Sequence, residues 1–120
     1  MRAAHAILLT LSLLVLPAFL MPEPAEARGS AASLGGKPAR WCGWWMRTQK
    51  GGGPELNLAR NWVKWGRPSG PRVGAVVVWS HHVGIITGRS ATGWIVKSGN
   101  DGGRVRERQR SVAGAVFRVG

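Results

Sequence analysis

The sequence has no tyrosine, two phenylalanines, one cysteine and five acidic residues among its 120 positions. A single cysteine excludes a scaffold held together by disulfides within the chain. The few carboxylates leave 17 lysines and arginines largely unopposed, so the formal net charge is +12. The length allows one domain, and 18 glycines with 7 prolines predict short elements separated by turns. Tryptophan, with seven residues, is the abundant aromatic.

The first residues have the pattern of an export signal. Arg2 provides a positive start, Ala6–Leu16 is almost wholly apolar, and Ala25-Glu26-Ala27 has the small-x-small pattern that signal peptidases cut after. We therefore predict a cleaved signal peptide at 1–27 and a mature protein in the periplasm or outside the cell. The alternative is an uncleaved anchor, but a spanning helix needs roughly 20 apolar residues and Pro17 interrupts this run.

The mature chain is expected to be one domain without a membrane span. Residues 28–37 are small, polar and glycine-rich and are interpreted as a flexible lead-in to a domain at 38–120. Removal of the signal peptide raises the net charge to +13, because one arginine and two glutamates are lost with it. Such a charge suits a surface rich in anionic polymers, including those of the bacterial envelope.

Cys42 is the one cysteine of this exported chain. Exported proteins that use cysteine for stability use it in pairs. Cys42 is therefore an intermolecular bridge, an inert buried thiol or a reactive thiol, and its isolation alone does not decide among these.

Two helices are predicted before the strands. The first follows Pro38 and ends at the glycines before Pro54, and it places Cys42 in its first turn or just before it. Free backbone N–H groups and the helix dipole at that position favour a thiolate. The second is expected over Leu56 to Trp65, with Leu58 and two tryptophans on its inner face.

From Val73 onward, β-branched residues and turns predict strands. Five strands are expected, at Ala75–Trp79, His82–Thr87, Trp94–Ser98, Val105–Arg108 and Ala113–Val119. Short connections predict that they form an antiparallel meander. Two helices followed by consecutive strands indicate an α+β domain, with the helices packed on one face of the sheet.

The residues that can carry chemistry are few. His81 and His82 are adjacent and should face opposite ways, so with the scattered acids they make a poor metal site and none is predicted. A nucleophile with a base is more economical. Cys42 at a helix start and His82 at the opening of a strand can meet, and Asn100, in the loop after the next strand, can orient the imidazole.

Several motifs together resemble those of CHAP domains, the cysteine, histidine-dependent amidohydrolase/peptidases of the wider NlpC-type group. These motifs are Trp41-Cys42, Leu58-Ala59-Arg60-Asn61-Trp62, Pro71-Arg72-Val73-Gly74, His82-Val83-Gly84-Ile85 and Ser98-Gly99-Asn100. The resemblance implies a papain-like fold that needs no cofactor. It also implies that Cys42 is the nucleophile, His82 the general base and Asn100 the orienting residue, and that the peptide part of peptidoglycan is the substrate.

Two other classes remain open. The first is a non-catalytic basic module that binds the cell envelope on the same fold. The second is a nucleic-acid binder, because Arg104, Arg106, Arg108 and Arg110 alternate along a predicted strand and tryptophans can stack on bases. The export signal disfavours this second class. Alternating arginines on a strand commonly form a solvated edge that blocks aggregation, and helical spacing assigns most tryptophans to the core. The oligomeric state is left open.

Overall fold

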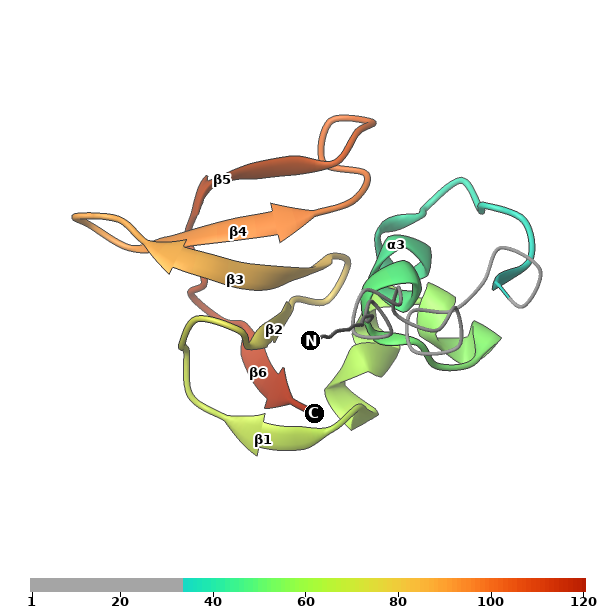
Figure 1. Cartoon of the computed structure of the whole chain (residues 1–120), viewed down its shortest axis with the longest axis horizontal. Helices are drawn as coiled ribbons and strands as arrows, with labels where there is room; N and C mark the ends of the chain where they lie inside the picture. The colour runs from blue at the N-terminus through green and yellow to red at the C-terminus, as the bar shows by residue number, and fades with distance from the viewer. Residues whose placement is uncertain (1–33) are drawn as a thin grey trace, which may run out of the picture.

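The computed structural model describes residues 34–120 (Figure 1). The predicted signal peptide and the lead-in up to residue 33 lie outside the described residues. In the described part, no helix has the length and apolar character needed to cross a membrane. The domain is α+β, with a few helical segments gathered on one side of an antiparallel sheet (Figure 1).

The first helical segment is the α-helix α3, Cys42–Lys50. Cys42 lies in the first turn, as predicted, although the helix begins at this residue and not directly after Pro38. The first backbone bond runs from the N–H of Trp45 to the carbonyl of Trp41, at 2.8 Å. Trp45 and Met46 are buried against the sheet. Gly51 ends the helix with a φ of 82°, a left-handed value that favours glycine.

The second predicted helix forms differently. Its residues make two short 3₁₀ segments, η2 (Pro54–Asn57) and η3 (Ala59–Lys64). Leu58 separates them in an extended conformation, with φ −84° and ψ 117°. The assignment of Leu58 to the inner face was wrong, because this break turns it outward and leaves it 44% exposed. Trp62 is buried as predicted and donates to the carbonyl of Leu56 at 2.7 Å.

The sheet has six strands rather than five. They are β1 (Arg67–Ser69), β2 (Val76–Val78), β3 (Val83–Arg89), β4 (Trp94–Ser98), β5 (Arg106–Arg110) and β6 (Val116–Val119). Their order is β1-β6-β2-β3-β4-β5, and all neighbours are antiparallel.

The predicted meander was wrong at both ends of the sheet. The chain leaves β5 at one edge and crosses to insert β6 between β1 and β2 (Figure 1). The added strand, β1, has the sequence Arg-Pro-Ser, which resembles a turn. Its proline lies on an edge strand, the position in a sheet where a missing N–H is tolerated.

The core lies on both faces of the sheet. On the helical face, Cys42, Trp45 and Met46 pack with Val76, Val78 and Val83, and Trp62 completes this cluster. On the other face, Val77, Ile86 and Val96 form a second cluster beneath Trp79, Trp94 and Phe117. The valine run of β2 is therefore apolar throughout because both of its faces are covered.

Arg47 fastens α3 to the segments around it. Only 2% of this residue is exposed. Its guanidinium donates to the carbonyls of Gly52 and Leu34, at 3.0 Å each, and to the side chain of Asn57, at 2.8 Å. A buried charge is tolerated when its donors are used in this way. The orientation of α3, and so the position of Cys42, depends on this set of bonds.

Candidate active site

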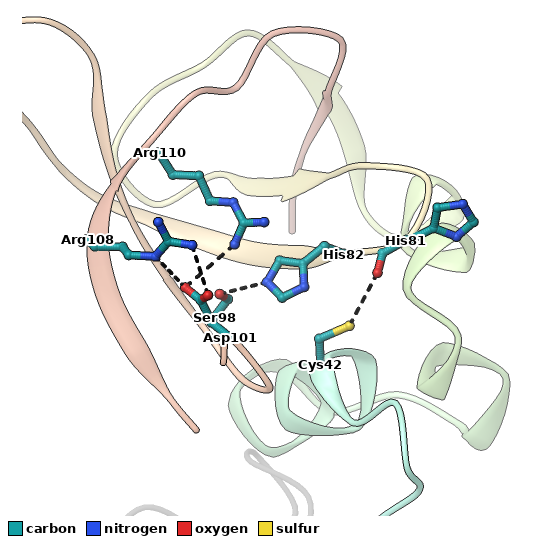
Figure 2. Close-up of polar contacts among 7 residues, drawn as sticks. All are labelled: Cys42, His81, His82, Ser98, Asp101, Arg108 and Arg110. Carbon is teal, nitrogen blue, oxygen red and sulfur yellow. Dashed lines mark hydrogen bonds and ion pairs between the residues drawn. The ribbon is translucent and has the colours of Figure 1, made fainter. Parts of the chain in front are cut away.

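Cys42, the first residue of α3, lies at the junction of the helix with the sheet. It is 4% exposed, and its Sγ lies 4.0 Å from the carbonyl oxygen of His81 (Figure 2). Gly43 follows because a Cβ there would collide with the backbone carbonyls of Leu56 and Asn57. The glycine thus lets the start of α3 approach η2, which holds the cysteine in place.

The thiol of Cys42 is more strongly protonated than the sequence predicts. Burial raises its pKa, and this effect outweighs the backbone N–H groups of Val83, Gly43 and Cys42, which lower it. The helix start therefore acts in the expected direction but is not the dominant influence. In the resting structure Cys42 is a neutral thiol directed at the His81 carbonyl.

His82 lies in the turn just before β3. Its Nε2 is 2.8 Å from the Oγ of Ser98, the last residue of the neighbouring strand β4 (Figure 2). The indole of Trp79 lies against the imidazole, with ring centroids 5.8 Å apart. Gly84 allows the start of β3 to lie this close to Ser98, because a Cβ on Gly84 would lie 2.9 Å from the Cβ of Ser98. The glycine of the His-Val-Gly motif is explained by this packing.

The imidazole of His82 is neutral at physiological pH. Burial is the largest cause that lowers its pKa from 6.5 to about 4, and the positive charges of Arg110 and Arg108 lower it further. Asp101 opposes them in part and raises the pKa. Cys42 and His82 thus form a neutral pair, in contrast to a thiolate with an imidazolium.

A charged cluster stands beside the imidazole (Figure 2). Asp101, which is largely buried, accepts two hydrogen bonds from the guanidinium of Arg108, at 2.8 and 2.9 Å. Arg110 approaches the same carboxylate at 3.6 Å. The hydrogen bond from Arg108 is the main reason that the pKa of Asp101 is lowered. Two of the alternating arginines on β5 are therefore held over the site.

One cavity of about 360 Å³ brings the candidate residues together. Cys42, His82 and Asn100 all line it, and Arg40 and His81 complete the wall. Asn100 has a φ of 52°, a left-handed conformation that asparagine tolerates better than most residues. The hydrogen-bond partner of the His82 ring is Ser98, and Asn100 lines the cavity shared with that ring.

Ser98 is the site residue that was not singled out from the sequence. A serine that ends a strand is common, and the Ser98-Gly99-Asn100 motif suggested Asn100 as the orienting residue instead. Its register is the available signal, because β4 pairs antiparallel with β3 and so places Ser98 beside the start of β3, close to His82. Ser98 is fully buried, so its hydroxyl has few partners other than the imidazole.

Among residues 34–120, no group of three or more histidine, cysteine or acidic side chains is arranged to hold a metal ion. Comparison of the chain with protein-family models, with curated proteins and with solved structures found no match. A neutral imidazole beside a neutral thiol can accept the thiol proton when the sulfur attacks an electrophile.

Proposed function

We propose that this protein is an exported cysteine hydrolase that cleaves amide or peptide bonds of peptidoglycan through an acyl-enzyme. The observation that carries the proposal is that Cys42 and His82 line the same cavity, while Nε2 of the imidazole is hydrogen-bonded to the buried Ser98. A cysteine at a helix start beside a histidine fixed by a third polar group is the arrangement expected of a cysteine nucleophile with its base.

The architecture supports a papain-like assignment of the CHAP or NlpC type. A helix that begins with the cysteine packs against an antiparallel sheet, the histidine precedes one strand, and the third polar residue ends the strand beside it. This order of elements agrees with the motifs that resemble CHAP domains. The assignment remains our proposal, with Ser98 added to the residues that the motifs suggest.

The first half of the reaction forms a thioester. With its proton on Nε2, donated to Ser98, His82 keeps a lone pair on Nδ1 for the thiol proton. Sγ of Cys42 attacks the amide carbon while that proton moves to His82. The tetrahedral oxyanion is stabilised by backbone N–H groups at the start of α3, including that of Cys42. Collapse breaks the C–N bond, and His82 passes its proton to the leaving amine.

The low pKa of His82 favours the transfer of its proton to the leaving amine. Because this pKa is about 4, the protonated imidazole is a strong proton donor. In the second half, His82 removes a proton from water, the hydroxide attacks the thioester, and the thiol leaves with the proton returned from the imidazolium. The products are one amine and one carboxylic acid, and the net reaction consumes one water molecule.

The charge of the protein supports an envelope substrate. The predicted mature chain carries +13, which attracts anionic polymers and raises the concentration of enzyme at the wall. The test is to incubate the purified protein with purified peptidoglycan and to identify released fragments by mass. Each cut should add one water, and Cys42→Ala and His82→Ala should release no fragments. His81→Ala serves as the matched control.

A non-catalytic envelope-binding module is the second candidate. The burial of Cys42 and the direction of its Sγ toward the His81 carbonyl favour it, because an inert thiol has this environment. The same experiment separates the two candidates. A binding module would sediment with peptidoglycan and release no fragments, whereas the proposed hydrolase would sediment with it and also release fragments. Nucleic acid is disfavoured further, because Arg108 in the alternating series is hydrogen-bonded to Asp101.

A further inference from the structure

Two larger cavities flank the Cys42–His82 pair. One, of about 450 Å³, is lined by Cys42 with Leu58 and Arg60 but not by His82. The other, also about 450 Å³, is lined by His82, Trp79 and Arg110 but not by Cys42. His81 borders both cavities and the smaller one that Cys42 and His82 share. Among the described residues, the three cavities therefore adjoin one another at His81, and one of the larger two borders Cys42 while the other borders His82.

The chemistry of the proposed reaction gives these two sides different occupants. The acyl part of the substrate becomes bonded to Sγ, so it must lie on the side of Cys42. The leaving amine takes its proton from His82, so it must lie on the side of the imidazole. The cavity lined by His82, Trp79 and Arg110 is therefore the place for the part of the substrate that leaves as an amine.

Arg110 is held in this cavity with unused hydrogen-bonding capacity. Its guanidinium lies 4.8 Å from the centroid of the Trp79 ring and 3.6 Å from Asp101. Its Nη1 is the buried atom that faces Asp101, at a distance too long for a hydrogen bond, while 27% of the side chain is exposed. Arg108 has already supplied two hydrogen bonds to Asp101. One carboxylate faces two guanidinium groups, so the positive charge of Arg110 is incompletely balanced.

We infer that Arg110 and Trp79 form a subsite for a carboxylate in the leaving-amine part of the substrate. This inference rests on the proposed function and specifies its substrate class as a peptide whose leaving fragment bears a free carboxylate close to the scissile bond. The guanidinium pairs with the carboxylate through the N–H groups other than the buried Nη1 that faces Asp101. The indole covers the apolar part of the same fragment and keeps the guanidinium in place through their stacking.

The test measures binding without turnover. The Cys42→Ala variant, labelled with ¹⁵N, is titrated with N-acetyl-alanyl-alanine, which ends in a carboxylate, and separately with its carboxamide. The indole N–H signal of Trp79 reports binding. We expect the acid to bind about tenfold or more tightly than the amide, because a charge-assisted pair is lost in the amide. Equal dissociation constants for the two probes would overturn the inference.

Substitutions of Arg110 test whether this residue is the source of the preference for the acid over the amide. In the same background, Arg110→Gln should bring the acid and the amide to within about twofold of each other, and Arg110→Lys should retain part of the preference. Arg89→Gln is the matched control, because Arg89 also stacks on a tryptophan, Trp94, at 4.5 Å, but does not line this cavity. A preference that survives Arg110→Gln would overturn the assignment.

The outcome is separable from that of the proposed function. Hydrolysis of peptidoglycan by the wild-type protein, with equal binding of the two probes, would overturn the subsite alone. A clear preference for the acid in a protein that hydrolyses nothing would overturn the proposed function and support the carboxylate site.

Discussion

Nε2 of His82 lies 2.8 Å from Oγ of Ser98, a residue with no exposed surface. This contact fixes one nitrogen of the imidazole and leaves the other for the thiol of Cys42. Because the hydroxyl is buried, the ring cannot exchange this partner for bulk water without opening the sheet. The orientation of the proposed base is thus built into the pairing of β3 with β4.

The first prediction concerns which residue orients the imidazole. Ser98→Ala should lower the rate of peptidoglycan hydrolysis by about tenfold or more, by analogy with the loss of the orienting member of a triad. The sequence prediction assigns that role to Asn100. If Asn100 serves only the left-handed turn, Asn100→Gly should retain wild-type turnover and melting temperature. If Asn100 orients the ring, Asn100→Gly should be as damaging as Asn100→Ala.

The second prediction separates the adjacent histidines. His82→Ala should abolish hydrolysis, whereas His81→Ala should retain it within a fewfold. The side chain of His81 is exposed, and the atom of this residue that Cys42 contacts is the backbone carbonyl, which the substitution keeps. Rates of fragment release for the two variants decide the matter. Full activity of His82→Ala with loss of activity in His81→Ala would move the base by one residue.

The third prediction is the pH dependence of His82. Its pKa of about 4 lies below the ordinary 6.5, so the base should stay unprotonated, and hydrolysis should persist, down to about pH 4. Titration of the ring by NMR should give the same midpoint. Arg110→Gln should raise this midpoint and Asp101→Asn should lower it, because the two charges act in opposite directions. A midpoint near 6.5 in the wild-type protein would contradict this environment.

The same shift has a consequence for stability. The unfolded chain takes up a proton at His82 more readily than the folded chain between about pH 6.5 and pH 4. The contribution of His82 to the free energy of unfolding should therefore fall as the pH is lowered through that range. His82→Ala should remove this part of the pH dependence, as measured by denaturant unfolding at several pH values.

The fourth prediction concerns the buried Arg47. Arg47→Ala removes the donors to two backbone carbonyls and to Asn57 and should lower the free energy of unfolding by about 2–4 kcal/mol. Lys50→Ala, at the exposed end of the same helix, is the control and should change it by less than about 1 kcal/mol. Denaturant unfolding measures both. Equal effects of the two substitutions would show that Arg47 does not fasten the helix.

Several features of the fold follow from local sequence, and others do not. The position of Cys42 in the first turn of α3 and the four strands from Val76 to Arg110 were predicted from periodicity and turn residues. The insertion of β6 between β1 and β2 was not, because it depends on pairing between segments about 50 residues apart. Local patterns carry little information about such long-range pairing.

The same division applies to the candidate site. Residue types drew attention to Cys42 and His82, and the structure places them around one cavity. The raised pKa of Cys42 was not predicted, because burial depends on the whole fold while the helix start can be recognised from the sequence. Ser98 was missed as the partner of the imidazole for a similar reason, since only the register of β4 against β3 brings it there.

The most direct test of the central claim is to trap the acyl-enzyme. The wild-type protein is mixed with soluble peptidoglycan fragments, quenched in acid and digested, and the peptide that contains Cys42 is examined by mass spectrometry. We predict an added acyl mass on Cys42 that hydroxylamine removes, as expected for a thioester. In Cys42→Ala both the added mass and the hydrolysis should be absent. Hydrolysis that continues undiminished in Cys42→Ala would contradict the account.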